Sequence, residues 1–283
     1  MAGSLTALRY AAFTDDPRGG NPAGVVLADV LPDEDEMQRV AAALGFSESA
    51  FVAPSAERDV HVIRYFSPEH EVTFCGHATI AAAVAMVERD PALDHVTFAT
   101  RTDTVPVAVR RDGPRVVATL TSPPASHRHV GSDILARALD TFGWTPDVLD
   151  PALAPVVASA GASHLVLPVA ERDVLAGMTY RFDDLKALMT EQGWTTVDVV
   201  WAETDARYHA RNPFPVGGVV EDPATGAAAA AFGGYLRDLG RIAVPGRVTI
   251  IQGVDMGRPS VLEVAVHDDR AGVDVSGSAV PLA

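Results

Sequence analysis

The chain has very few of the residues on which several common enzyme chemistries depend. Its 283 residues include one cysteine, Cys75, and one lysine, Lys186. A single cysteine excludes an intramolecular disulfide and a catalytic pair of thiols. A pyridoxal phosphate enzyme needs a lysine for its Schiff base, and Lys186 lies in DDLKALM, a segment typical of a solvated helix. We therefore expect no cofactor of that kind.

Clustered positive charge and long apolar runs are also missing. Lys and Arg number 22 against 37 Asp and Glu, which gives a formal net charge of −15. This balance argues against nucleic acid and anionic membranes as partners, but a local site can still hold a small anionic substrate. No apolar run reaches transmembrane length, and MAGSLTALRYAAF has no basic stretch ahead of a long apolar core. We expect a cytoplasmic protein that acts on a small anion.

Sequence motifs for metals and nucleotides are missing as well. The nine histidines are scattered, and the one close pair, His127 and His129, has no thiol or carboxylate at ligand spacing. Neither GxGxxG nor GxxxxGK[ST] occurs. We expect no metal and a chemistry without cofactors.

Turn-forming residues divide the chain into short β runs and a few helices. The sequence has 23 glycines and 20 prolines, and 48% of its residues are hydrophobic, which is typical of a globular protein with many turns. The patterns predict helices over 32–44, 132–142, 181–192 and 225–239, and a further one that starts after TFCGHAT and ends near Arg89. They predict strands over 5–12, 23–27, 49–54, 60–66, 96–100, 105–110, 116–120, 156–159, 164–168, 197–202 and 206–211, with four short β runs at the end.

The two halves of the chain resemble each other. RYFSP precedes CGHAT and the helix IAAAVAM, and RNPFP precedes DPATG and the helix AAAAAFGGYL, with 11 residues from Arg64 to Cys75 and from Arg211 to Asp222. An alanine-rich helix without a polar face belongs inside other structure. We therefore expect an α+β fold of two pseudo-symmetric domains, 1–124 and 125–283. Each is a curled, mostly antiparallel, barrel-like sheet around a central helix, and the last strand can return to the first domain.

The starts of these two helices are candidate anion sites. The first turn of a helix leaves backbone N–H groups free and carries a partial positive charge. Gly76 and Gly226 would let a carboxylate approach the backbone. Equally, each glycine could serve only a tight turn from loop to helix.

Four side chains are candidates for proton transfer. Glu48 lies among the apolar residues of GFSESAFV, where desolvation would suit its carboxylate to act as a general base near neutral pH. Cys75 precedes a helix start, which makes a thiol ionise more readily. His77 and Asp222 complete the set. The alternatives are a solvated glutamate, a small buried cysteine, a core histidine and a helix N-cap aspartate.

Five blocks of sequence carry a family resemblance. In order they are GNPAGVVL, GFSESAFV, RYFSPEHEVTFCGHAT, EDPATGAA and QGVDMGRPS. Together they resemble the PhzF-like phenazine biosynthesis family. The resemblance implies the diaminopimelate-epimerase-like fold, a homodimer, and a cofactor-independent isomerase that shifts a double bond by proton transfer in a dihydro-hydroxyanthranilate-like acid.

The resemblance also implies roles for single residues. Glu48 is the general acid and base in a cleft between the domains, and His77 and Asp222 bind and polarise the substrate. The implied substrate-binding residues are Asn21, Gly76, Gly226 and Ala227. Ala227 departs from the family pattern, because a serine usually follows DPATG. The missing hydroxyl removes one substrate hydrogen bond worth about 1 kcal/mol, which puts the substrate in question more than the reaction.

Two other functions stay open on the sequence. One is an epimerase or racemase that pairs Cys75 with Glu48 or Asp222. The other is a protein that binds small acids without catalysis.

Overall fold

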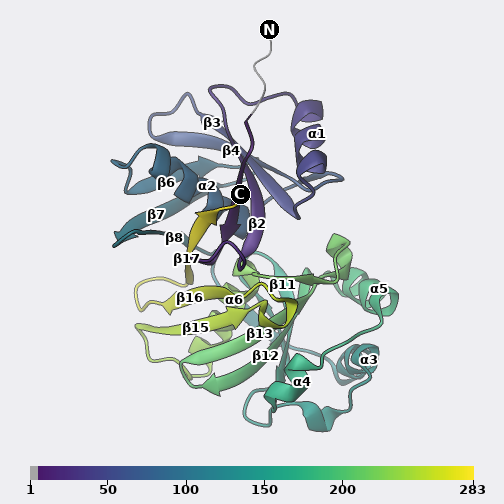
Figure 1. Cartoon of the computed structure of the whole chain (residues 1–283). Coiled ribbons are helices and arrows are strands. Elements are labelled where there is room, and N and C mark those ends of the chain that lie inside the picture. Colours follow the sequence, from purple (N-terminus) through teal and green to yellow (C-terminus); the bar gives the residue numbers. More distant parts are fainter. Residues whose placement is uncertain (1–5) are drawn as a thin grey trace. The chain divides into compact units, whose positions relative to one another are not determined.

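The computed structural model describes residues 6–283, and its contacts divide the chain into two compact units (Figure 1). Unit 1 contains the described residues up to Thr121 together with Ser276–Ala283, and unit 2 contains Ser122–Val275. The segment between the last strand of unit 1 before unit 2 and the first strand of unit 2 is short, because one strand ends at Thr121 and the next begins at Ser126.

Unit 1 is an eight-stranded closed sheet around one helix. Its strands pair in the order β17–β1–β2–β3–β4–β6–β7–β8, and β8 pairs with β17 to close the ring. The β2–β3 and β4–β6 pairs are parallel. The strands are β1 (Leu8–Ala12), β2 (Asn21–Leu27), β3 (Glu48–Pro54), β4 (Val60–Phe66), the short β5 (Glu71–Val72), β6 (His95–Ala99), β7 (Thr104–Asp112), β8 (Arg115–Thr121) and β17 (Asp274–Pro281).

The helix inside this ring is the alanine-rich one. Helix α2 (Gly76–Arg89) is buried at every position from His77 to Val87, where most side chains are Ala, Val or Thr. Small side chains let strands approach the helix backbone from all sides. Outside the ring, α1 (Glu34–Leu44) packs Met37 and Ala41 against the sheet. Both of its ends are capped, because Asp33 accepts a 2.8 Å hydrogen bond from Glu36 N and Gly45 is left-handed with φ +68°.

Unit 2 repeats this plan around α6 (Gly226–Asp238). Its strands pair in the order β9–β10–β11–β12–β13–β15–β16, and β11–β12 and β13–β15 are parallel. The strands are β9 (Ser126–His129), β10 (Val156–Ser159), β11 (Ser163–Val169), β12 (Thr196–Thr204), β13 (Arg207–Pro213), the short β14 (Glu221–Asp222), β15 (Gly246–Gln252) and β16 (Ser260–Val266). The other helices are α3 (Ser132–Phe142), α4 (Arg172–Ala176) and α5 (Phe182–Gln192), with 3-10 turns η1 (Pro146–Val148), η2 (Pro215–Gly217) and η3 (Val254–Met256).

Close approach explains the two glycines in the middle of α6. A Cβ at Gly234 would lie 2.3 Å from Ala125 Cβ, and one at Gly233 would lie 2.4 Å from a methyl of Val264.

On its outer face, the unit 2 sheet is covered by α3 and α5, which pack on the side chains that alternate with the inward ones, such as Leu165 and Val197.

The same order of strand directions in both units confirms the predicted pseudo-symmetry. From β1 to β7 the successive pairs are antiparallel, parallel, antiparallel, parallel and antiparallel, and from β10 to β16 they are the same. In each unit the central helix follows the fourth strand of this series and a two-residue strand.

Most predicted elements lie within two residues of those observed. Strand β9 and helix α4 are additions, and both are five residues or fewer. Four β runs are predicted at the end, and the structure has three strands there together with a 3-10 turn at 254–256. Residue 5 of the first predicted strand lies outside the described residues. Within 6–283, no helix has the length and apolarity to span a membrane.

A chain of buried polar side chains crosses the unit 2 sheet. His164 Nδ1 and Thr196 Oγ1 are 2.8 Å apart, Thr196 Oγ1 donates to Asn212 Oδ1 at 2.7 Å, and Asn212 Nδ2 donates to Asp198 Oδ1 at 2.8 Å. All four residues are at most 2% exposed. Burial raises the pKa of Asp198 from its usual 3.8 to about 7 and lowers the pKa of His164 to about 3. The neutral forms are therefore favoured in the folded protein.

These shifts predict a pH-dependent effect of Asp198→Asn. The folded protein keeps a proton on Asp198 that the unfolded chain releases above pH ~4, so this carboxyl lowers the free energy of unfolding as pH rises to about 7. His164 has the opposite effect on the free energy of unfolding below pH 6.5, because this side chain binds a proton at a higher pH in the unfolded chain than in the folded protein. Relative to wild type, the variant should gain up to about 1.4 kcal/mol of stability per pH unit between pH ~4 and ~7.

Urea unfolding monitored by tryptophan fluorescence measures this, because all three tryptophans lie in unit 2. Asp269→Asn, at an exposed turn of the same unit, is the matched control. A stability difference that does not change with pH would contradict the prediction.

Candidate functional site

In unit 1, the starts of two strands and one helix lie together. Because β2 and β3 are parallel, with Ala23 opposite Glu48, their first residues lie at the same edge of the sheet. Asn21 is the first residue of β2 and Glu48 the first of β3, and both are near the beginning of α2. His77, the second residue of α2, is the side chain that contacts both.

The ring of His77 lies between an amide and a carboxylate. Asn21 Nδ2 is 3.2 Å from His77 Nδ1, and Glu48 Oε2 is 3.4 Å from His77 Nε2. Ser47 Oγ is also 3.4 Å from Nε2. The side chains of His77 and Glu48 are 6% and 15% exposed. With the amide nitrogen donating to Nδ1, the neutral ring carries its proton on Nε2, directed toward Glu48 and Ser47.

Cys75 is the N-cap residue of α2 and lies against the same ring. Its Sγ is 3.3 Å from His77 Nδ1 and 3.7 Å from Nε2. Its side chain makes no capping hydrogen bond. The carbonyl of Cys75 accepts from Thr79 Oγ1 at 2.7 Å, and Thr79 is in turn 2.6 Å from the buried hydroxyl of Tyr65. Hydrogen bonds of Thr79 and Tyr65 inside the ring of strands thus hold the start of α2.

Three of these side chains have atoms of the kinds that bind metal ions. A carboxylate oxygen of Glu48, Sγ of Cys75 and a ring nitrogen of His77 all lie within 4.8 Å of one another. The sequence alone predicted neither a role for Ser47 nor a shared set of metal ligands, because 27 positions separate Glu48 from Cys75. The one local signal was the SES triplet before a strand.

In unit 2, a glutamine joins Asp222 to the start of α6. Gln252 Nε2 donates to the carbonyl of Asp222 at 2.7 Å and to Thr225 Oγ1 at 3.1 Å, and its Oε1 accepts from Thr225 N at 3.1 Å. Thr225 Oγ1 donates to Asp222 Oδ2 at 2.6 Å. Gln252 is 1% exposed at the end of β15. Gln252 is the first residue of the QGVDMGRPS block, and the sequence alone predicts no role for it.

The structure aligns the starts of α2 and α6 differently from the equal 11-residue spacings in the sequence. Cys75 and Thr225 are the N-caps, and neither makes a side-chain capping bond. Gly76 therefore corresponds to Gly226 and His77 to Ala227, and Asp222 lies three residues ahead of its N-cap. The equal 11-residue spacings did not align equivalent positions, because the loops before β5 and β14 differ in length.

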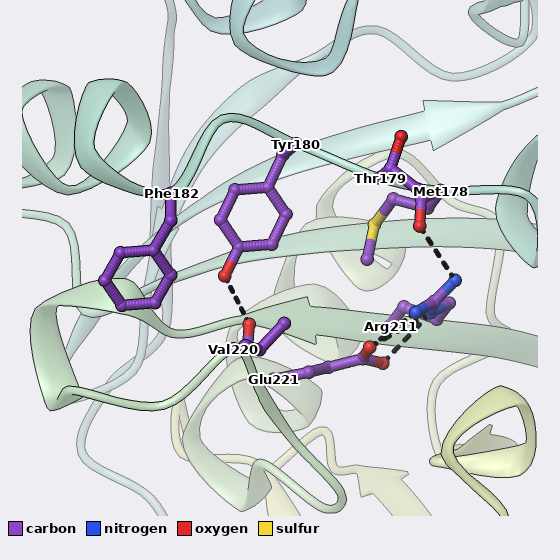
Figure 2. Close-up of a pocket in the computed structure, with 7 residues that line it drawn as sticks. All are labelled: Met178, Thr179, Tyr180, Phe182, Arg211, Val220 and Glu221. Atoms are coloured by element: carbon purple, nitrogen blue, oxygen red, sulfur yellow. Dashed lines mark hydrogen bonds and ion pairs between the residues drawn. The ribbon is translucent and has the colours of Figure 1, made fainter.

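An arginine–glutamate pair holds each two-residue strand in place. Arg211 Nη2 donates to Glu221 at 2.6 Å in unit 2, and Arg64 Nη2 donates to Glu71 at 2.6 Å in unit 1. In Figure 2, Arg211 lies between Glu221 and the carbonyl of Met178 in a pocket of about 220 Å³. Its Nη1 also donates to the carbonyls of Leu175 and Ala176.

That pocket is not the predicted site. It is lined by Met178, Thr179, Tyr180, Phe182, Arg211, Val220 and Glu221, and none of these was a candidate. The guanidinium is occupied by protein acceptors, and the hydroxyl of Tyr180 donates to the carbonyl of Val220. The pocket wall thus anchors the strand that carries Asp222.

The predicted residues are therefore grouped within each unit. Unit 1 brings together Asn21, Glu48, Gly76 and His77, with Cys75 and Ser47 beside them. Unit 2 places Asp222, Gly226 and Ala227 around the start of α6, braced by Gln252.

Comparison with known proteins identifies the family. Residues 10–283 match the family described as phenazine biosynthesis-like protein, PhzC-PhzF. The chain belongs to this family. It is 30% identical over 281 residues to the uncharacterized isomerase YfhB of Bacillus subtilis, covering 96% of this chain and 95% of that one. It is 31% identical to a trans-2,3-dihydro-3-hydroxyanthranilate isomerase of Pseudomonas aeruginosa, with the same coverage.

A solved structure confirms the fold class expected from the resemblance. The chain is similar to the PhzF-family phenazine biosynthesis protein of Bacillus anthracis, with a TM-score of 0.88, 26% identity and coverage of 99% and 97%. The fold is diaminopimelate-epimerase-like, and the PhzC-PhzF family member described here is an isomerase.

The bracing by Gln252 predicts a cost for its removal. Gln252→Leu keeps the volume but leaves the carbonyl of Asp222 and the N–H of Thr225 without their hydrogen bonds. The free energy of unfolding of unit 2 should fall by about 2–4 kcal/mol. Gln252→Glu, which keeps the acceptor for Thr225 N and loses the donor, should fall between the leucine variant and wild type in urea unfolding monitored by tryptophan fluorescence. Equal stability of all three proteins would contradict this role.

Proposed function

We propose that Glu48 is the general acid and base of an isomerase that moves a proton, and with it a double bond, within a small carboxylic acid. The observation that carries this is the Glu48 carboxylate, 15% exposed and 3.4 Å from the Nε2 atom of His77 at the start of a buried helix. A carboxylate that is partly desolvated and adjoins a neutral donor can take a proton from carbon and return it to another carbon.

The proposed role of His77 is to donate a hydrogen bond from Nε2. Asn21 favours the tautomer with hydrogen on Nε2, so the ring can donate to Glu48 or to an oxygen of a bound substrate. Such a donor stabilises the enolate-like charge that develops as Glu48 removes the proton. In this proposal Asn21 orients the ring of His77, His77 polarises the substrate, and Glu48 carries the proton.

The proposed carboxylate site is the start of α2. Because the first turn of a helix has no partners within the helix for its backbone N–H groups, those at Gly76 and His77 are candidates to bind an anion. Asp222, Gly226 and Ala227 as substrate-binding residues, and a homodimer, stay predictions from the resemblance. The relative from Pseudomonas aeruginosa is named for trans-2,3-dihydro-3-hydroxyanthranilate. A related cyclic acid is our proposed substrate class, with Ala227 lacking the hydroxyl usual there.

Replacing Glu48 tests the proposal. Glu48→Gln keeps the size and polarity of the side chain but cannot carry a proton, so turnover should fall by about 10²–10⁴-fold. Dihydroaromatic acids that shift the thermal unfolding of wild type are incubated in D₂O, and deuterium incorporation at carbon is measured by mass spectrometry. The variant should still bind the acid and lose the incorporation.

Glu57→Gln, at an exposed glutamate beyond the end of β3, is the matched control and should exchange like wild type. Undiminished deuterium incorporation in Glu48→Gln would overturn the role of Glu48.

An epimerase that uses Cys75 is the second candidate, and one contact favours it. Sγ of Cys75 lies 3.3 Å from His77 Nδ1, which is a geometry suited to a thiol that exchanges its proton. The two functions differ in the effect of Cys75→Ala. The Glu48 isomerase should lose less than about tenfold in rate, whereas an epimerase should lose most of its activity, about 10²–10⁴-fold. The deuterium assay measures both, and a loss in the upper range would replace the first proposal with the second.

A further inference from the structure

We infer that Glu48, Cys75 and His77 form an inhibitory binding site for a zinc-like divalent cation. The three donors are a carboxylate, a thiolate and an imidazole, which is a ligand set suited to Zn²⁺. They come from the start of β3 and the start of α2, so the pairing of the sheet, and not one loop, brings them together.

The three donor atoms lie close enough together to bind one ion after local rotation of a side chain. Zinc–ligand bonds of about 2.0–2.3 Å place neighbouring ligand atoms about 3.3–3.7 Å apart. His77 Nε2 is 3.4 Å from Glu48 Oε2 and 3.7 Å from Cys75 Sγ, and all three donor atoms lie within 4.8 Å of one another. Because Cys75 Sγ lies 3.3 Å from Nδ1 and 3.7 Å from Nε2, an ion bound through Nε2 requires rotation of the Cys75 side chain or of the His77 ring.

Charge and burial also suit a cation. A carboxylate and a thiolate together neutralise a divalent ion, and the side chains of His77 and Glu48 are 6% and 15% exposed. Three protein ligands leave a fourth position for water or for a substrate carboxylate. The formal net charge of −15 favours the approach of cations.

Binding must displace protons. The thiol of Cys75 is deprotonated, and the proton on His77 Nε2 moves to Nδ1, where the amide oxygen of Asn21 can accept it after rotation of the amide. The ion therefore competes with protons, and its affinity rises with pH. It also occupies the carboxylate that moves the substrate proton. This inhibitory effect rests on the proposed function, whereas the binding itself does not.

The test measures binding and activity separately. Purified protein is titrated with Zn²⁺ against a chromophoric chelator, and with Co²⁺ to observe thiolate-to-metal charge-transfer absorption. We expect one equivalent bound, with the absorption band present. Cys75→Ser and Glu48→Gln should each weaken Zn²⁺ binding by about tenfold or more, because one ligand is lost. Cys75→Ser should also remove the band.

His95→Ala is the matched control, because His95 and Asp94 form an exposed histidine–carboxylate pair 2.6 Å apart that could take up zinc on its own. This variant should bind as wild type does. Zinc binding that is absent, or that is unchanged in both Cys75→Ser and Glu48→Gln, would overturn the site.

The activity measurement separates this inference from the proposed function. Zn²⁺ should abolish deuterium incorporation by wild type, and a chelator should restore it. If zinc binds at this site without affecting the incorporation, the site stands and the role of Glu48 as the proton carrier is overturned. If Glu48→Gln abolishes the incorporation while wild type binds no zinc, the proposed function stands and the metal site is overturned.

Discussion

Enclosure of two helices made of small residues is the constraint on which the rest of the structure depends. Helix α2 is buried at every position from His77 to Val87, and α6 is buried from Ala228 to Leu236. A helix with such small side chains offers little apolar surface on any one face, so it is stabilised only where strands surround it. In unit 1 the surrounding sheet closes with eight strands, and in unit 2 it approaches the helix so closely that a Cβ at Gly233 would lie 2.4 Å from a methyl of Val264 in β16.

This enclosure also determines where chemistry is available. The middle of α2 is covered by side chains, and its first turn lies at the edge of the sheet where the parallel strands β2 and β3 begin. Backbone N–H groups, a carboxylate and a ring nitrogen therefore meet at a place that the packing of the core already fixes. The equivalent position in unit 2 is held by hydrogen bonds from Gln252 and by the Arg211–Glu221 pair. Both arrangements support precise placement of polar groups on rigid elements.

Much of the fold was predictable from local pattern. Alanine composition identified both central helices, Asp33 and Gly45 marked the ends of α1, and alternating apolar residues marked most strands. Strand β9 was missed because SHRH has no apolar residue, and its pairing with β10 supplies what its composition does not. The spacing of 11 residues indicated a true duplication but aligned Asp222 with Cys75, since sequence distance does not record that the two loops before the helices differ in length.

Local patterns in the sequence are enough to predict the two central helices, the duplicated α+β plan and, through five ordered blocks, the family to which the chain belongs. Local propensity and burial pattern depend on neighbours within a few positions, so they can be read directly from the residues. The contacts of His77 with Cys75 and Glu48 are visible only in the folded chain, and so is the burial of Asp198 in a chain of hydrogen bonds. Those contacts depend on strand register and on which strands run parallel, and these are set by packing across the whole unit.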